Sequence, residues 1–313
     1  MVIADAKKYL LFMQIPPFLK PGDTVGVVAP ASRFPYDELV DGLRILRDEW
    51  KLNVIEGKSL RAEDGPFAGS DELRRTDLQQ LFDNPEVRAV FAARGGYGCY
   101  RLADDLDLTG LQRKPKWLVG FSDITVLLSL FYNAGIVSLH GLMPRQFGQP
   151  ERTDALESVR QWLFGEVPSS YTTPAHPLNR TGQTSGPLVG GNLTLLVNSI
   201  GTPTDIDFTG AILFIEDIDE TLFSLDRMMT QLRRAGRLSN LAGLIVGQFT
   251  DMRDSASLPF GRDASQIIAD AVSDYDYPLL FNFPAGHVDH NLALPIGWRV
   301  NLRVGETGEV IFN

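Results

Sequence analysis

The sequence predicts an α/β protein in two parts, a parallel-sheet domain followed by a smaller α/β domain that is partly β-rich. Three observations support this fold class. The chain has 313 residues, which at roughly 150 residues per domain corresponds to two domains. Short β-rich runs alternate with helical patterns through its first half, and this alternation stops between Gln146 and Thr184. The composition, 44% hydrophobic and 22% charged, is typical of a globular protein with a sizeable core.

The first half contains five strand candidates, at residues 24–29, 53–55, 87–92, 117–120 and 136–139. Helical patterns lie between them, at 36–50, 70–82 (with Ser70 or Asp71 as the cap) and 123–132. Strands that alternate with helices form βαβ units, in which helices cover both faces of a parallel sheet. We therefore expect a flavodoxin-like parallel sheet in residues 1–165.

The second half begins after a segment rich in proline and in paired Ser and Thr residues. This composition predicts a linker over 166–184, preceded by a helix over 153–164. In 185–313, strand candidates at 211–215, 241–246 and 279–283 alternate with helical patterns at 222–235 and 264–272. The tail, 298–312, alternates like an antiparallel pair with a turn at 305–308.

Charge and cysteine content restrict the partners and the location. The 29 Lys+Arg and 39 Asp+Glu residues give a net charge of -10. An acidic surface repels phosphate backbones and anionic lipids, so we expect neither a nucleic acid nor a membrane as partner. Cys99 is the only cysteine, which excludes an internal disulfide and a cysteine-based zinc site. The N-terminal apolar run, 9–13, is too short for a secretory signal, and we expect a cytoplasmic protein.

A serine stands at the junction of a predicted strand and a predicted helix. The apolar run 117–120 leads through Phe121 into Ser122, and the helical pattern begins at Asp123. This arrangement projects a hydroxyl at the carboxyl edge of a parallel sheet and points free helix N–H groups to the same place. Position 124 is Ile, so the Gly-x-Ser-x-Gly pattern of α/β-hydrolases is absent. The residues alone allow Ser122 to be a nucleophile or a helix cap.

A glycine-rich turn, Arg94-Gly95-Gly96-Tyr97-Gly98, follows the third strand candidate. The backbone amides of such a loop approach a phosphate or a developing oxyanion closely. The spacing matches neither a Walker A motif nor G-x-G-x-x-G. A tight turn that uses glycine for positive φ explains the same residues equally well.

Histidines and acids complete the candidates. His287 and His290 lie in a loop after the strand candidate 279–283, and the absence of a third ligand nearby argues against a metal site. His140 ends a short strand and is expected to be buried, whereas His176 lies in the linker and is expected to be solvated. Four carboxylates follow the strand candidate 211–215, at Glu216, Asp217, Asp219 and Glu220. They are either charges at a helix N-terminus or a source of the acid that orients an imidazole.

Seven stretches of the sequence resemble the LD-carboxypeptidase family of serine peptidases, which includes the microcin-immunity enzymes. They are GDTVGVVAPAS (22–32), ARGGYG (93–98), GFSDIT (120–125), SLHG (138–141), GPLVGGNL (186–193), LFIEDIDE (213–220) and GHVDHNLALPIG (286–297). Seven blocks in the family's order are far more specific than any one of them. The sequence departs from the family's pattern at two places. Cys99 stands where a serine is usual, and the segment 1–18 is longer than expected.

The resemblance implies a catalytic triad of Ser122, Glu216 and His287. Ser122 would be the nucleophile, His287 the general base and Glu216 the acid that orients it. Because Ser122 belongs to the first predicted domain and the other two residues to the second, we expect the site at the interface of the domains.

The resemblance also implies the groups around the triad. The oxyanion hole is expected from the backbone N–H groups of Asp123 and of Gly95 or Gly96, and Arg94 and Tyr97 are expected to bind substrate. No metal or other cofactor is implied.

The function implied by the resemblance is that of a serine carboxypeptidase which cleaves the L-D peptide bond of a peptidoglycan tetrapeptide. Terminal D-alanine would be released during cell-wall recycling, by a protein expected to be a homodimer. An alternative within the family is a microcin-immunity-type peptidase or amidase that acts on peptidyl-nucleotides. An alternative of another class is a non-catalytic flavodoxin-like module whose Arg94 loop binds an anion. It predicts that Ser122→Ala leaves ligand binding and biological activity intact.

Overall fold

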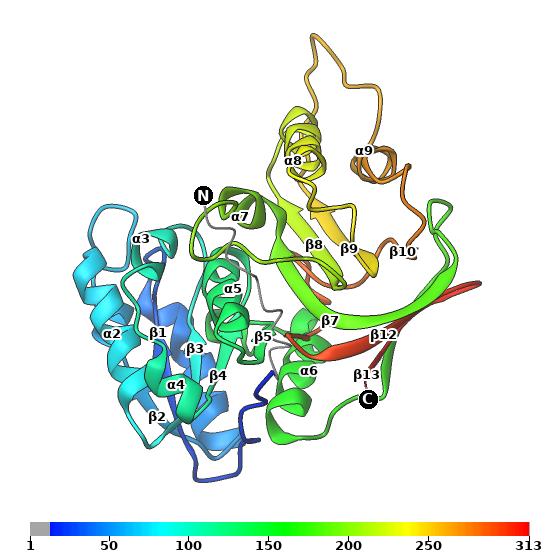
Figure 1. The fold of residues 1–313 in the computed structure, drawn as a ribbon. Coiled ribbons are helices and arrows are strands. Elements are labelled where there is room, and N and C mark those ends of the chain that lie inside the picture. The colour runs from blue at the N-terminus through cyan, green and yellow to red at the C-terminus, as the bar shows by residue number, and fades with distance from the viewer. Residues whose placement is uncertain (1–12, 313) are drawn as a thin grey trace, which may run out of the picture.

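The computed structural model describes residues 13–312 and contains two sheets that lie side by side (Figure 1). The first sheet has six strands in the order β11-β5-β4-β3-β1-β2, and the second has seven in the order β10-β9-β8-β7-β12-β13-β6. The two-part α/β fold predicted from the sequence is confirmed.

The first sheet is parallel except at one edge. Its five parallel strands are β1 (Thr24–Val28), β2 (Asn53–Glu56), β3 (Val87–Ala92), β4 (Trp117–Gly120) and β5 (Ser138–His140). The order β2-β1-β3-β4-β5 is that of flavodoxin-like folds. The inner strands are almost entirely buried because helices cover both faces, whereas the edge strand β2 is partly exposed.

Short helices connect these strands. They are η1 (Tyr36–Leu39), α1 (Val40–Arg44), η2 (Ile45–Glu49), η3 (Lys58–Arg61), α2 (Asp71–Asp83), α3 (Tyr100–Ala103), α4 (Thr109–Arg113), η4 (Ser122–Ile124) and α5 (Thr125–Asn133). The predicted helix 36–50 is a 3₁₀ turn, an α turn and a π turn in succession. The π turn closes where the Trp50 N–H bonds the Ile45 carbonyl (2.9 Å), and Trp50 is buried. Ser70 caps α2 by accepting the Leu73 N–H.

The second sheet mixes parallel and antiparallel strands. Strands β7 (Gly182–Asn192), β8 (Ile212–Ile218), β9 (Gly243–Thr250) and β10 (Leu279–Leu280) are parallel. Strands β12 (Arg299–Val304), β13 (Gly308–Phe312) and β6 (Ser170–Thr173) add to it in antiparallel fashion. The predicted antiparallel tail is therefore present. Helices α7 (Leu193–Asn198), α8 (Leu222–Arg234) and α9 (Ala264–Ala271) accompany the parallel strands.

The segment 166–184, predicted as a linker, contributes β6 and the start of β7 to the second sheet. In the part of the chain between β5 and β6, η5 (Pro144–Gln146) and η6 (Pro150–Arg152) precede α6 (Thr153–Phe164). The chain later returns to the first sheet, because β11 (Leu294–Ile296) pairs antiparallel with β5. The two sheets are thus not cleanly separated along the sequence.

Contacts between the halves hold the two sheets together. Thr125 Oγ1, at the start of α5, accepts the backbone N–H of Asn192 at the end of β7 (3.0 Å). Gly191 permits this approach, because a Cβ added there would lie 2.6 Å from Thr125 Oγ1. One buried cluster contains Val119 of the first sheet and Phe214 of the second. The halves therefore share a hydrophobic core.

Residues 13–18 of the predicted N-terminal extension pack against the first sheet, and residues 1–12 lie outside the described residues. Trp117 Nε1 donates to the Pro17 carbonyl (3.2 Å), and the Trp117 ring stacks on Phe18. No helix of the described chain has the length and apolar character required to span a bilayer.

Candidate active site

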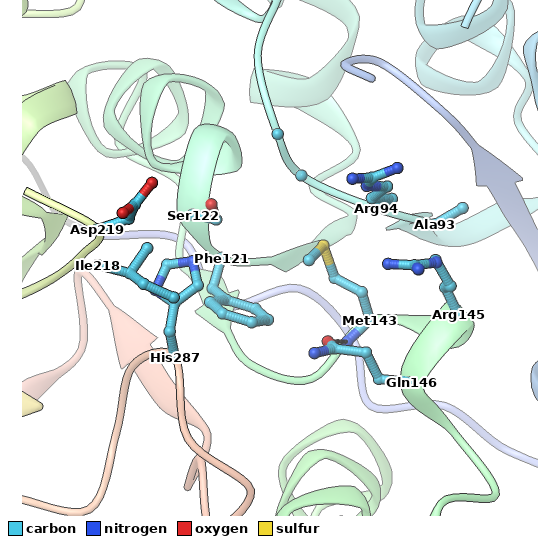
Figure 2. Close-up of a pocket in the computed structure, with 12 residues that line it drawn as sticks. Ala93, Arg94, Phe121, Ser122, Met143, Arg145, Gln146, Ile218, Asp219 and His287 are labelled. Atoms are coloured by element: carbon cyan, nitrogen blue, oxygen red, sulfur yellow. Dashed lines mark hydrogen bonds between the residues drawn. The ribbon is translucent and has the colours of Figure 1, made fainter. Parts of the chain in front are cut away.

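A cavity of ≈ 390 Å³ lies at the carboxyl edge of the first sheet. It is lined by Ala93, Arg94, Gly95, Gly96, Phe121, Ser122, Met143, Arg145, Gln146, Ile218, Asp219 and His287. These residues follow β3, β4 and β5 of the first sheet, lie at the end of β8, or follow β10 (Figure 2). Ligands of open α/β sheets bind at this edge.

Ser122 is held in a strained turn directly after β4. Phe121 is extended, and Ser122 then adopts φ +64°, a left-handed conformation that costs energy for a residue other than glycine. Ser122 is the first residue of η4, and no side chain caps that helix or α5. The helix-cap interpretation is therefore not what the structure shows. The turn leaves the serine lining the cavity.

His287 and Glu216 form a hydrogen-bonded pair. His287 Nδ1 lies 2.7 Å from Glu216 Oε2, and the Glu216 side chain is fully buried. Glu216 lies within β8, at the point where its register with β9 shifts. Burial lowers the pKa of His287, but the charge of Glu216 and the hydrogen bond to it outweigh this effect, so the pKa is raised above its usual value.

The imidazole of His287 faces the cavity close to Ser122 (Figure 2). Its ring packs against Phe121, with the centroids 5.0 Å apart. No hydrogen bond joins Ser122 to His287 among the side chains drawn in Figure 2. Such bonds are often long in the free enzyme and shorten when substrate binds. The structure therefore brings the three predicted catalytic residues to one place.

The other three acids of the cluster point elsewhere. Asp217 accepts hydrogen bonds from Asn192 Nδ2 (2.8 Å) and from the Thr194 backbone N–H (3.0 Å). Asp219 lines the cavity and pairs with Arg253 (3.4 Å). Glu220 faces Thr194 Oγ1 (3.4 Å). Because α8 starts only at Leu222 and is capped by Thr221, these acids do not form a helix N-terminus.

The Arg94 loop lies directly against Ser122. A Cβ added at Gly95 would be 2.9 Å from Ser122 Cβ and 3.2 Å from its Oγ. The backbone N–H groups of Gly95 and Asp123 have no partner within the described chain, so both are free to bind an oxyanion. Gly96, at φ +107°, lies instead against Ser32, whose Oγ would be 2.3 Å from an added Cβ.

Three hydrogen bonds from Ser32 and Asp123 fix this loop, and the sequence did not predict them. The Ser32 N–H donates to the Gly95 carbonyl (3.3 Å). Ser32, after β1, accepts the Tyr97 N–H through its Oγ (3.1 Å). Buried Asp123 accepts the Cys99 N–H through Oδ2 (2.8 Å). Two features of the sequence could have indicated Ser32. It ends the stretch 22–32 that supported the family resemblance, and it follows a predicted strand.

Of the two side chains predicted to bind substrate, Arg94 lines the cavity and Tyr97 does not. Arg94 lines the cavity, and its Nη1 donates to the Arg33 carbonyl (2.6 Å). Tyr97 is 55% exposed, packs on Phe67 and does not line the cavity. Arg145 does line it and was not predicted. Its position shortly after β5, at the same sheet edge, was the available signal.

The remaining three histidines have different surroundings, and none belongs to a metal-ligating cluster of the described residues. His140 is fully buried between Phe121 and Phe214, and burial lowers its pKa to about 4, so it is neutral. His290 lies 3.7 Å from Asp154. His176 stacks on Phe281. The described residues contain no group of three or more His, Cys, Asp or Glu side chains suited to a metal ion.

Two family models match the chain. The LD-carboxypeptidase N-terminal domain matches residues 25–141, and the LD-carboxypeptidase C-terminal domain matches residues 185–302. A probable murein peptide carboxypeptidase of Bacillus subtilis is 37% identical over 304 residues, which are 95% of this chain and 93% of that protein.

Solved structures agree with this assignment. The muramoyltetrapeptide carboxypeptidase of Oxalobacter formigenes superposes with a TM-score of 0.81 at 29% identity, covering 92% of this chain and 98% of that one. The microcin C7 self immunity protein MccF shares the fold, with a TM-score of 0.83 at 20% identity over 96% of this chain and 98% of its own. The resemblance noted in the sequence is thereby confirmed, and the chain belongs to the LD-carboxypeptidase family of peptidases.

Proposed function

We propose that this protein is a serine carboxypeptidase that hydrolyses the L-D bond at the end of a peptidoglycan tetrapeptide and releases D-alanine during cell-wall recycling. The observation that carries the proposal is the hydrogen bond from His287 to buried Glu216 beside the cavity that Ser122 lines. Similarity to a murein peptide carboxypeptidase and to a muramoyltetrapeptide carboxypeptidase supports the substrate class.

The reaction begins with proton transfer between two residues of the cavity. His287 Nε2 takes the proton of Ser122 Oγ while the oxygen attacks the scissile carbonyl. The negative charge that develops on the carbonyl oxygen is received by the N–H groups of Asp123 and of Gly95 or Gly96. His287 then protonates the amine of D-alanine as the bond to it breaks, and the shortened peptide remains as an ester on Ser122.

Water completes the cycle. His287 takes a proton from the water molecule, which attacks the ester, and returns a proton to Ser122 as the peptide leaves. Glu216 stabilises the imidazolium formed twice in this cycle and keeps the proton on Nδ1, so that Nε2 is the basic nitrogen. The raised pKa of His287 makes it a stronger base for these steps.

The proposal is tested by incubating the protein with a tetrapeptide that ends in D-alanine and following its mass. A matched peptide that ends in L-alanine has the same composition and an L-L terminal bond. We expect loss of one alanine from the first peptide alone. No loss from either peptide, or equal loss from both, would contradict the proposal.

The cavity favours a peptide over a peptidyl-nucleotide. Nucleobases bind by stacking on exposed aromatic rings. Phe121 and His287 are the only ring side chains among the described lining residues, and Phe121 is 2% exposed and packed against His287. Phe121 therefore offers no exposed face to a base, and the His287 ring is held by its contacts with Phe121 and Glu216. Likeness to MccF at 20% identity concerns the fold.

The proposal also covers the location of the protein and its oligomeric state. The acidic composition and single cysteine support a cytoplasmic protein, where an enzyme that recycles internalised wall peptides would act. We infer a homodimer from the family likeness. Cell fractionation and light scattering on the purified protein test these two points, and a periplasmic or monomeric protein would contradict them.

A further inference from the structure

Two arginines face the cavity on the side of Ser122 opposite His287 (Figure 2). Arg94 follows β3, and Arg145 belongs to η5 after β5. Their spacing is fixed by the backbone, since the Arg145 N–H donates to the carbonyl of Ala93, the residue before Arg94 (3.3 Å). Asp219, the acid that lines the cavity, lies on the His287 side.

The two guanidinium groups have more positive charge than their surroundings neutralise. Arg94 forms no ion pair with a described residue and donates only to the Arg33 carbonyl. Arg145 pairs through Nε with Glu38. Burial lowers the pKa of Arg94, and repulsion by the nearby cation Arg145 lowers it further. The two cations and the Glu38 carboxylate leave a surplus positive charge of one on this side of the cavity.

The position of this charge matches the substrate of a carboxypeptidase. In such a substrate the terminal carboxylate lies one residue beyond the scissile carbonyl, and one extended residue spans at most about 3.6 Å. A group that receives the carboxylate must therefore lie within one residue of the attacking oxygen. Arg94 and Arg145 line the same cavity as Ser122, and Arg94 directly precedes Gly95, where an added Cβ would lie 3.2 Å from Ser122 Oγ.

We propose that Arg94 and Arg145 together bind the C-terminal carboxylate of the peptide substrate and so restrict the enzyme to the last peptide bond. The inference rests on the proposed function and adds the group that selects a chain end. Arginine suits this role because its planar N–H groups bind both oxygens of a carboxylate. An internal peptide bond presents no charge at this point and would leave the two cations unpaired.

The test compares a tetrapeptide with a free terminal carboxylate and the same peptide as its C-terminal amide. We expect the wild type to cleave the acid with a kcat/KM about 10²-fold higher than the amide, as for loss of one partner of a buried charge pair. Arg94→Gln and Arg145→Gln should remove most of this preference by slowing cleavage of the acid, with little change for the amide. Arg94→Lys retains the charge without the planar fork and should restore part of the preference.

Arg44→Gln is the matched control, because Arg44 on α1 is exposed and pairs with Glu49 (2.7 Å) outside the cavity. It should keep the wild-type preference, and thermal melting should show that every variant folds. A wild type that cleaves both peptides equally, or arginine variants that slow both equally, would overturn the carboxylate site while the peptidase function stands.

If the wild type cleaves neither peptide, the proposed function fails and binding decides the carboxylate site separately. Calorimetry with Ser122→Ala protein should then show tighter binding of the acid than of the amide. Adding Arg94→Gln to this protein should abolish the difference. Equal affinities of the Ser122→Ala protein for the two peptides would overturn the site.

Discussion

Glu216 is the residue on which the orientation of the base depends. Its carboxylate is fully buried, and one of its oxygens holds His287 Nδ1 at 2.7 Å. Burying a charge costs free energy unless a partner compensates it, so the ionised Glu216 carboxylate depends on the hydrogen bond with the imidazole. The neighbouring Asp217 is also buried, but its hydrogen bonds are to Asn192 and Thr194. One acid therefore acts on the histidine, and the next one fixes β7 and α7 to β8.

Glu216→Gln is expected to lower kcat about 10⁴-fold, because the neutral amide allows the wrong tautomer to face Ser122. The pH profile gives a second readout. His287 must be neutral to act as a base, so kcat/KM of the wild type should rise with pH through a pKa above the usual 6.5. Without the charge of Glu216 that pKa falls, and the midpoint should move to lower pH.

Asp217→Asn and Glu220→Gln are the controls for this prediction, since both acids lie in the same segment without touching His287. We expect milder losses of kcat from both variants. The pH midpoint should stay unmoved in Glu220→Gln, whereas Asp217→Asn should lower it less than Glu216→Gln does, because the charge of Asp217 is a smaller cause of the raised pKa of His287. If Glu216→Gln kept most of its activity while Glu220→Gln lost it, the orienting acid would be Glu220.

His140 gives a pH-dependent contribution to stability. Burial holds its folded pKa at about 4, below its unfolded value of 6.5. Below pH 6.5 the unfolded chain takes up a proton that the folded protein does not, so the free energy of unfolding falls as pH drops towards 4. The full loss is on the order of 3 kcal/mol.

Denaturant unfolding of the wild type and His140→Phe between pH 4 and 7.5 measures this contribution. Phenylalanine is similar in size and does not titrate, so the variant should gain stability relative to the wild type as the pH falls. A difference between the two proteins that is constant with pH would show that His140 is not buried as a neutral group.

At the scale of elements, the site depends on the close approach of two loops. The strained turn after β4 presents Ser122, and the Arg94 loop after β3 passes against it. Neighbouring parallel strands end at the same edge, so their loops meet there. Ser32 then fixes the Arg94 loop by two hydrogen bonds, and Asp123 fixes it by one.

Gly95→Ala should therefore reduce activity with little loss of stability. The added Cβ would lie 2.9 Å from Ser122 Cβ and 3.2 Å from Oγ, so the nucleophile must shift. A displacement of this kind lowers kcat about 10²-fold. Gly305→Ala is the matched control, because a Cβ there meets nothing within 4 Å. Steady-state kinetics and melting temperatures check the pair, and a fully active Gly95→Ala would contradict the packing of the loop on Ser122.

The sequence predicted elements well where apolar periodicity was strong and poorly where glycine and proline break it. The five parallel strands of the first sheet and α6 lie where expected. Strand β7 was missed because it contains four glycines and Pro187. Pro187 is tolerated because β7 pairs with β12 up to this residue and with β8 from Leu188 onward, so its missing N–H falls where the partner changes.

At the scale of the whole molecule, the site is assembled from both halves of the chain. Ser122 and the Arg94 loop come from the first sheet, whereas Glu216 and His287 come with the second. The family motifs indicated these residues in advance. They include Ser32 without indicating its contacts with the Arg94 loop, and they do not include Arg145. Both residues act through contacts between segments far apart in the sequence, which single-residue patterns do not encode.

We expect catalysis to need no metal ion. The cavity offers a serine, a histidine and an acid, and the described residues contain no cluster of three or more metal-ligating side chains. Incubation with excess EDTA followed by dialysis should leave kcat/KM unchanged. Loss of activity that zinc restores would show that a metal takes part.

The central claim, that Ser122 is the nucleophile served by His287 and Glu216, is tested most directly by Ser122→Ala. Turnover of a D-alanine-terminated tetrapeptide is measured by mass, with circular dichroism and melting to establish that the variant is folded. We predict a loss of at least about 10⁴-fold in kcat, as in other serine triads, without a change of fold. A folded Ser122→Ala protein that releases D-alanine at close to the wild-type rate would contradict the claim.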